Sequence, residues 1–321
     1  MSYITGTQKN DKITPDLLTG GISGSPTPFP SNEDDEIHGY AGSDYIVAGG
    51  GSDFIFGDDT DDQKGNDTLD GGSGADYLYG HAGNDTYIID TAGDQIFEST
   101  AASGGIDTVR SSVLSVSLAA FGGDNSGLEN ITLTGSKSLS AIGNKFANVL
   151  TGNGAANQLA GNGGNDQLVG GSGNDTLDGG SGNDKLVGQA GSDLLVGNLG
   201  ADILIGGTGQ DVFRFRSASH SAPGAVDQLT AGDGGKAFDG AGSAAGDILD
   251  LSGIDANTAK GGDQSFILGG SGAGHLTLSN SGTDTILRGN TDADSAFEFQ
   301  LVIHDGSGVS ASHYTAADFL L

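Results

Sequence analysis

A nine-residue repeat between Gly152 and Arg214 constrains the fold of this chain more than any other feature of its sequence. Seven units follow one another without an insertion, and each begins with glycine. The fourth position is glycine in every unit but the first, the sixth is Asp or once Asn, and the eighth is Leu or once Phe. Such a period predicts a solenoid, in which each unit packs only against its neighbours.

Each unit divides into a turn of six residues and a strand of three. Glycine adopts left-handed backbone conformations without steric cost, so the turn can fold back tightly and leave peptide carbonyls exposed. In the strand, alternation sends the side chain at position eight to one face and its neighbours to the other. We therefore expect Leu168, Leu177 and Leu186 to point into a shared core, and the turns to present rings of oxygen atoms.

This pattern, Gly-Gly-x-Gly-x-Asp-x-Leu-x, resembles the calcium-binding nonapeptide of RTX proteins. The resemblance implies an all-β fold, a calcium-bound parallel β-roll (β-solenoid) with two units in each right-handed coil. Residues 18 positions apart would then lie one above the other. The aspartates at position six would form two rows, one of Asp175, Asp193 and Asp211 and the other of Asp166, Asp184 and Asp202.

Carboxylates stacked in this way need counter-ions. Neighbouring strands lie about 4.8 Å apart, and two bare carboxylates at that distance repel by roughly 3.5 kcal/mol at an effective dielectric constant of about 20. Calcium accepts about six to eight oxygen ligands at irregular angles, whereas magnesium demands octahedral geometry. We therefore predict several calcium ions between successive turns. The alternative is that each Asp only closes a turn and keeps the surface soluble.

The same register occurs earlier in the chain. Residues 6–14 fit one degenerate unit, with Asp11 at position six. The register then resumes with an aspartate at position six and an apolar residue two places later: Asp35 with Ile37, Asp44 with Ile46, and Asp53 with Ile55. The first of these units lacks its glycines, so Asp35 is a weaker candidate ligand than the others.

An acidic insertion interrupts this first block of repeats. It shifts the frame by five residues, after which Asp67, Asp76 and Asp85 continue the register, with Leu69, Leu78 and Tyr87 expected to face inward. We expect the insertion to be a solvated acidic loop. The alternative is an extra cation site made by Asp58, Asp59, Asp61 and Asp62.

The predicted calcium ligands are the carboxylates at position six and the oxygens of the glycine turns. The carboxylates belong to Asp44, Asp53, Asp67, Asp76, Asp85, Asp166, Asp175, Asp184, Asp193, Asp202 and Asp211. The glycines are Gly49, Gly51, Gly71, Gly72, Gly74, Gly161, Gly164, Gly170, Gly171, Gly173, Gly179, Gly180, Gly182, Gly188, Gly191, Gly197, Gly200, Gly206, Gly207 and Gly209.

The sequence divides the chain into five parts. We expect an N-terminal arm with the degenerate repeat and a Pro-rich loop at 1–34, a first repeat block at 35–90, a metal-free connecting segment at 91–147, a second repeat block at 148–214, and a C-terminal cap and secretion domain at 215–321.

In the connecting segment the glycine turns stop while runs rich in Ile, Val and Thr persist. It resembles the segments that join repeat blocks in secreted RTX proteins and alginate epimerases. Residues 113–121 form either a strand or a short helix.

The C-terminal part, residues 206–321, resembles the C-terminal domain of serralysin-type secreted metalloproteases. The alternating runs HLTLS, DTILRG and FEFQLVI predict a small β cap that covers the otherwise unpaired edge of the last coil. Proteins of that family usually carry an acidic calcium-binding run in this region. Here Asp292 and Asp294 of that run are present but its glycine is missing, which argues against an extra ion there. The ending Asp318-Phe319-Leu320-Leu321 resembles the export signal of type I (ABC) secretion machines, with a final β-strand as a compatible alternative.

Composition excludes several function classes. The formal charge of −30 argues against a nucleic-acid partner, because phosphates need a basic surface. The chain has no cysteine, no long apolar run that predicts a transmembrane segment, and no basic-then-apolar N-terminal signal peptide. It also has no His-Glu-x-x-His and no Gly-x-Ser-x-Gly motif, so we predict no catalytic residues and no cofactor other than calcium.

Three functions fit these observations. The first is a secreted calcium-binding repeat protein without catalytic activity, which binds a cell surface or an extracellular polysaccharide or has a structural role there. The second is a host-directed, membrane-active RTX factor. The third is the repeat module of an RTX polysaccharide-modifying enzyme or protease.

Overall fold

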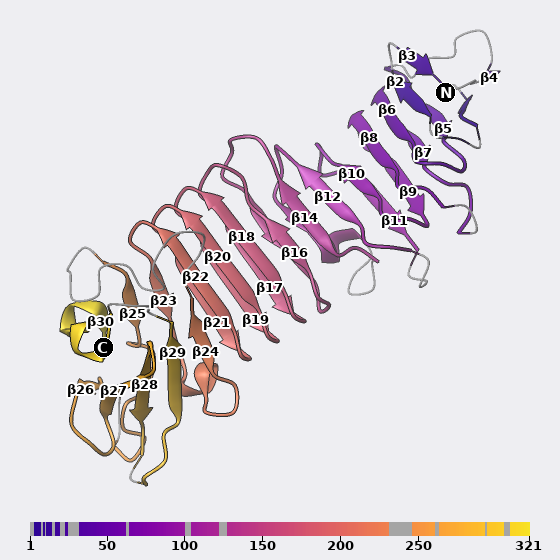
Figure 1. Cartoon of the computed structure of the whole chain (residues 1–321). Helices are drawn as coiled ribbons and strands as arrows, with labels where there is room; N and C mark the ends of the chain where they lie inside the picture. Colours follow the sequence, from indigo (N-terminus) through magenta and orange to yellow (C-terminus); the bar gives the residue numbers. More distant parts are fainter. Residues whose placement is uncertain are drawn as a thin grey trace. The chain divides into compact units, whose positions relative to one another are not determined.

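The computed structural model of this chain describes residues 3–7, 9, 11–14, 17–19, 23–24, 32–61, 64–99, 104–121, 127–230, 246–260, 263–292, 294–304 and 309–321. The chain forms two compact units, Met1–Asn144 and Lys145–Leu321. Across the described residues both units consist of short β-strands and a few turns of 3-10 helix, without α-helix (Figure 1). The predicted all-β class is confirmed. The loop predicted for residues 15–30 contains two short strands, β3 (Leu17–Thr19) and β4 (Ser23–Gly24), and its remaining residues lie outside the described ones.

The first unit winds through two main sheets. One contains β1 (Tyr3–Thr5), β4 (Ser23–Gly24), β5 (Glu36–His38), β7 (Phe54–Phe56), β9 (Tyr77–His81) and β11 (Gln95–Glu98), in the order β11-β9-β7-β5-β1-β4. The other contains β2 (Lys12–Thr14), β3 (Leu17–Thr19), β6 (Tyr45–Gly50), β8 (Thr68–Ser73), β10 (Thr86–Ile88), β12 (Thr108–Ser111) and β14 (Asn130–Leu133). Its order is β14-β12-β10-β8-β6-β2-β3. Strands of the repeats pair in parallel, as a β-roll requires.

The end of the first unit departs from this alternation. After β12 the chain forms β13 (Val116–Ser117) and one turn of 3-10 helix, η1 (Leu118–Phe121). Strand β13 pairs in parallel with β15 (Ser140–Ile142). Both alternatives for residues 113–121 were therefore partly right.

The second unit also has two sheets. One contains β16 (Val149–Thr151), β18 (Gln167–Ser172), β20 (Lys185–Ala190), β22 (Ile203–Thr208), β24 (Asp227–Leu229), β29 (Phe299–Ile303), β28 (Asp284–Asn290), β27 (His275–Ser281) and β26 (Ile267–Leu268), in that spatial order. The other contains β17 (Gln158–Gly163), β19 (Thr176–Ser181), β21 (Leu194–Leu199), β23 (Val212–Arg214), β25 (Ile248–Asp250) and β30 (Phe319–Leu320). Short 3-10 turns are η3 (Ala218–Ser221), η4 (Ala311–His313) and η5 (Ala316–Asp318).

The register of the second unit follows directly from the repeat. Leu168 pairs with Leu186, and Leu186 with Leu204, so each coil uses two nine-residue units. The strands are six residues long where three were expected, because positions two and three of the turn also pair with the next coil. Position one is skipped in the pairing, which leaves a local irregularity at each first glycine.

Position eight of each unit builds the core. Leu159 is 1% exposed, Leu168, Leu177 and Leu186 are fully buried, and Phe213 ends the row at 0% exposure. The equivalent residues of the first block, Ile37, Ile46, Ile55, Leu69, Leu78 and Tyr87, are also fully buried. The inward positions were thus predicted correctly. Burial of one such side chain stabilises the fold by about 1.5–3 kcal/mol, and only stacked coils bury it.

The C-terminal strands extend one sheet of the second unit. Strand β29 pairs in parallel with β24, the last coil strand of that sheet, and β28 and β27 continue outward as antiparallel neighbours. Strand β30 adds to the other sheet beside β25. The edge that the last coil would otherwise expose is therefore paired on both sheets.

Aromatic rings stack on the outer side of the first unit. His38, Phe56, Tyr79 and Phe97 come from four neighbouring strands, and their ring centroids are 4.6, 4.6 and 4.5 Å apart in turn. Phe54 and Tyr77 form a second stack at 4.6 Å. These contacts add to the backbone pairing that holds β5, β7, β9 and β11 in register.

Candidate metal centres

The glycine turns bring successive coils so close that side chains are excluded. Gly182 has a φ of 128°, and a Cβ atom there would lie 1.7 Å from the carbonyl oxygen of Gly164. Every predicted glycine at position four of the second block has a positive φ. Position two is less strict, because Asn162, Gln189 and Asn198 adopt left-handed angles there. Position four therefore demands glycine, whereas position two only favours it.

Each position-six aspartate uses one oxygen to hold the preceding coil. Oδ1 of Asp184 accepts a hydrogen bond of 2.8 Å from the backbone N–H of Asp166. Equivalent bonds of 2.6–2.9 Å end on Oδ1 of all the predicted aspartates: Asp44, Asp53, Asp67, Asp76, Asp85, Asp166, Asp175, Asp184, Asp193, Asp202 and Asp211. The side chains are thereby fixed in two rows within each unit.

Ten of these carboxylates have a second oxygen that is buried without a hydrogen-bond donor. This holds for Oδ2 of Asp44, Asp53, Asp67, Asp76, Asp85, Asp166, Asp175, Asp184, Asp193 and Asp202. The residues themselves are between 0% and 3% exposed. A buried carboxylate oxygen without a partner is costly, so each of these atoms needs a ligand.

Carbonyl oxygens lie next to these unpartnered atoms. A Cβ atom on Gly188 would lie 2.3 Å from Oδ2 of Asp193 and 2.5 Å from the carbonyl oxygen of Gly206 in the next coil. The same pair of neighbours surrounds Gly161, where Asp166 and Gly179 supply the oxygens. Anionic and neutral oxygens without nitrogen or sulfur are the donor set that calcium prefers. The turns therefore fit calcium, with these aspartates and glycines as its proposed ligands.

Burial raises the pKa of these carboxyl groups. The pKa rises to about 8 for Asp67, to about 7 for Asp44, Asp53, Asp166 and Asp202, and to about 6 for Asp76, Asp85 and Asp193. For Asp175 and Asp184 the pKa is also raised by burial. The cause is desolvation of the charged form, and a bound dication would favour that form instead.

The acidic insertion of the first unit differs from its prediction as a solvated loop. Asp58 is fully buried, and both of its carboxylate oxygens lack a hydrogen-bond partner. Burial, with smaller contributions from Asp85 and Asp44, raises its pKa to about 7. Asp59 and Asp61 instead form ion pairs with His38 and His81, and Asp62 lies outside the described residues. Asp58 is therefore a candidate ligand that the nine-residue pattern does not reveal.

A second ladder joins the coils on the exposed side of the turns. Oδ1 of Asn165 accepts from the backbone N–H of Asn183 at 2.8 Å, and Oδ1 of Asn183 accepts from that of Ala201 at 2.9 Å. Asn66 and Asn84 do the same in the first unit. These bonds run opposite to those of the aspartates, and the frequent Asn at position five was the signal for them.

The C-terminal acidic groups behave differently. Oxygens of Asp292, Asp294 and Glu298 lie within 4.8 Å of one another, although Asp294 is exposed. Asp318 is buried, and its Oδ2 accepts from the N–H of Thr315 at 2.7 Å, which caps η5. Phe319 and Leu320 form β30, so the expected final strand is present, and an export role of this ending stays a prediction.

No helix in the described parts of the chain is long and apolar enough to cross a membrane.

Comparison with known proteins supports the calcium assignment. Residues 31–63, 64–88, 142–177 and 178–213 match the family described as RTX calcium-binding nonapeptide repeat (4 copies). These segments are RTX repeats, and calcium is their metal. The solution structure of the AlgE6R3 subunit from the Azotobacter vinelandii mannuronan C5-epimerase is similar at 24% identity and a TM-score of 0.33, over 56% of this chain and 80% of that one.

The comparisons leave two points as they were. No curated protein matches the chain. None of the four matched segments extends beyond residue 213, so the expected likeness of the C-terminal part to serralysin-type domains stays a prediction.

Proposed function

We propose that this chain, which carries RTX calcium-binding repeats, is a secreted protein that folds when calcium binds outside the cell. In this proposal it is not an enzyme and acts as a binding or structural protein at the cell surface or in the extracellular matrix. The observation that carries the proposal is the row of buried aspartates, each with one oxygen that no protein group satisfies. A fold with so many unsatisfied carboxylates is poorly stable until a cation binds them.

Calcium availability would control where folding occurs. Extracellular calcium-binding modules typically have dissociation constants of about 10⁻⁴ to 10⁻³ M. In calcium-poor cytoplasm the chain would remain unfolded, with a net charge of −30 that repels itself. Outside the cell, metal binding would supply folding free energy, and a chain without cysteine has no disulfide to do so.

The C-terminal residues support export in the unfolded state. Phe319 and Leu320 form the last strand of the second unit, and Phe319 is only 8% exposed. Asp318 and Phe319 are therefore accessible to a secretion machine only before the chain folds, whereas Leu320 stays exposed. Export through a type I (ABC) machine is tested by removing residues 318–321 and measuring secretion in a host that carries such a machine. Calcium-dependent folding of the purified truncated chain, measured in parallel, separates lost export from lost folding.

Far-UV circular dichroism against calcium tests the folding part of the proposal. We expect a cooperative transition from coil to β-structure with calcium and none with magnesium at the same concentration. Metal counting on the folded chain should give several ions. A fully ordered spectrum in excess chelator would contradict the proposal.

Two further assays test the partner. Binding to alginate or another acidic polysaccharide, mediated by calcium, would support a role in the matrix. Calcium-dependent release of dye from liposomes would instead favour a membrane-active factor. A chain that binds neither and turns over no polysaccharide would leave a structural role as the function.

A further inference from the structure

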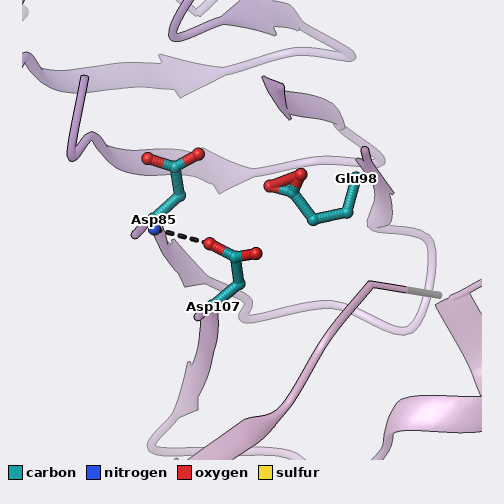
Figure 2. Close-up of side chains that lie close together, drawn as sticks. All are labelled: Asp85, Glu98 and Asp107. Carbon is teal, nitrogen blue, oxygen red and sulfur yellow. Dashed lines mark hydrogen bonds between the residues drawn. The ribbon is translucent and has the colours of Figure 1, made fainter. Parts of the chain in front are cut away.

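Three carboxylates meet just beyond the last glycine turn of the first unit. Asp85, Glu98 and Asp107 each direct an oxygen into one space, and these oxygens lie within 4.8 Å of one another (Figure 2). Asp85 belongs to the repeat, but Glu98 ends β11 and Asp107 precedes β12 in the segment without glycine turns. Neither was among the ligands predicted from the sequence.

Glu98 occupies the place of a turn carbonyl. In the second unit a Cβ atom on Gly188 would meet Oδ2 of Asp193 at 2.3 Å and the carbonyl oxygen of Gly206 at 2.5 Å. In the first unit a Cβ atom on Gly80 would meet Oδ2 of Asp85 at 2.4 Å and Oε1 of Glu98 at 2.6 Å. Glu98 follows Gly80 by the same 18 residues that separate Gly206 from Gly188. The hydroxyl oxygen of Tyr87 lies nearer still to that Cβ position, so a carboxylate oxygen and the hydroxyl that donates to it stand where the second unit has a neutral carbonyl oxygen.

Asp107 completes the arrangement as a position-six aspartate would. Its Oδ1 accepts from the backbone N–H of Asp85 at 2.6 Å, and its Oδ2 is buried without a partner. Asp107 and Asp85 are 0% and 1% exposed. Oδ2 of Asp107 is therefore a buried oxygen without a partner beside the carboxyl groups of Asp85 and Glu98, which is the situation that a bound cation resolves.

Neighbouring groups hold Glu98 in place. The hydroxyl of Tyr87, a fully buried side chain, donates to Oε1 of Glu98, and the backbone N–H of Ser99 donates to Oε2 at 2.6 Å. Each carboxylate oxygen retains a further lone pair for a metal. Glu98 also lines a cavity of about 670 Å³ between β11 and η1.

We propose that Asp85, Glu98 and Asp107 form a calcium site that binds more tightly than the repeat sites, because a charged ligand replaces a neutral one. Calcium affinity in oxygen sites rises with the number of charged ligands. Calcium binding then extends into the segment that we expected to be metal-free. This inference rests on calcium binding by the wild-type chain and adds one site with its own ligand set.

The charge of Glu98 is the first test. Glu98→Gln keeps the size of the side chain and removes its charge, and Glu33→Gln makes the same change at an exposed position of the first unit. Calcium titration of the full chain by calorimetry should show that Glu98→Gln weakens the tightest site about tenfold or more. Glu33→Gln should leave it unchanged. Equal affinities of Glu98→Gln and the wild type would overturn the proposal, and a wild type that binds no calcium would overturn the proposed function instead.

Terbium luminescence gives a second readout that does not depend on the stability of Glu98→Gln. The chain has no tryptophan, so tyrosine is the sensitiser, and Tyr87 contacts the site through Glu98. Emission excited through tyrosine should rise with the first equivalent of terbium bound to the wild type. Tyr87→Phe keeps all three carboxylates and, compared with the wild type at equal amounts of bound terbium, should lose most of that emission. Emission equal to wild type in Tyr87→Phe would place the first ion elsewhere and overturn the proposal.

Discussion

The backbone N–H of Asp166 donates to Oδ1 of Asp184 at 2.8 Å, while Oδ2 of Asp184 is buried without a hydrogen-bond partner. One carboxylate therefore joins two coils and still offers an oxygen to a cation. The first task needs only an acceptor, and the second needs a negative charge. The two tasks can be separated by substitution.

Asp184→Asn should separate them. Asparagine keeps an acceptor for the N–H of Asp166 but removes the charge, so the calcium midpoint of folding should rise several-fold to about tenfold. In chelator at pH 7 the same variant should be more stable than wild type, because a buried charge with a raised pKa is gone. Circular dichroism measures both, as the calcium midpoint and as the β-structure that remains in chelator. The matched control is Asp263→Asn, an exposed position outside the turns. An unchanged or lower calcium midpoint in Asp184→Asn would contradict its role as a ligand.

Stability without metal should depend on pH in an unusual direction. Asp44, Asp166 and Asp202 have folded-state pKa values of about 7, above the value of about 3.9 expected in the unfolded chain. Between these values the folded chain binds more protons than the unfolded one, so its free energy of unfolding falls as pH rises. Circular dichroism in chelator should therefore show more β-structure near pH 4.5 than near pH 7, where the chain is expected to be unfolded.

The calcium midpoint of folding should change little over the upper part of this range. The carboxyl groups of the unfolded chain, with pKa values of about 3.9, and those that hold calcium are both ionised between about pH 5.5 and about pH 8, so folding with calcium takes up no protons there. Below about pH 5 the unfolded chain also binds protons, and the calcium concentration needed for folding should rise. Titration by circular dichroism at several pH values measures this, and a midpoint that stays constant below about pH 5 would contradict the carboxylates as ligands.

Gly182 and Gly154 make a matched pair of turn glycines. Gly182→Ala places a Cβ atom 1.7 Å from the carbonyl oxygen of Gly164 at a φ of 128°. It should lower the free energy of unfolding with calcium by about 2 kcal/mol or more. Gly154→Ala meets no heavy atom within 4 Å and should change it by at most about 1 kcal/mol. Similar losses in both variants, measured by urea unfolding, would argue against close packing at position four.

Asp58 tests whether the acidic insertion contributes to calcium binding. Both of its oxygens are buried and unpartnered, whereas Asp61 forms an ion pair with His81 at the surface. Asp58→Asn should lower the calcium affinity of the first unit about tenfold, because a charged ligand is lost. Asp61→Asn should have little effect, because exposed ion pairs contribute at most about 1 kcal/mol. Calorimetric titration of the full chain compares the two variants. Equal effects of Asp58→Asn and Asp61→Asn would show that the insertion is a solvated loop without a calcium ligand.

The repeat made much of the fold predictable. Glycine at position one, Asp at position six and Leu at position eight specify a turn, a candidate ligand and a core contact, and each recurs at a fixed interval. The 18-residue spacing alone therefore predicts that Leu168 lies beside Leu186 and Asp166 beside Asp184, as they do. A one-dimensional stack has only nearest-neighbour contacts, so one correct unit predicts the next.

Residues that break the interval escaped the same reasoning. Asp107 follows Asp85 by 22 residues, and Glu98 stands where the pattern has glycine. The burial of Asp58 depends on how a five-residue insertion folds back over the turn, which a period cannot specify. The pairing of β29 with β24 joins segments about 70 residues apart, and no repeat links them.

The opposed ladders of aspartate and asparagine side chains make both surfaces of a coil complementary to those of an identical coil. A repeat block therefore changes its length by whole coils. Duplication of residues 166–183 would add one coil, and every contact of that coil would be of a kind already present. Duplication of nine residues would add half a coil and move every later strand, β24 and β29 included, to the opposite sheet. A gene encoding such a chain can therefore grow or shrink in steps of 18 codons that leave every later strand in its own sheet.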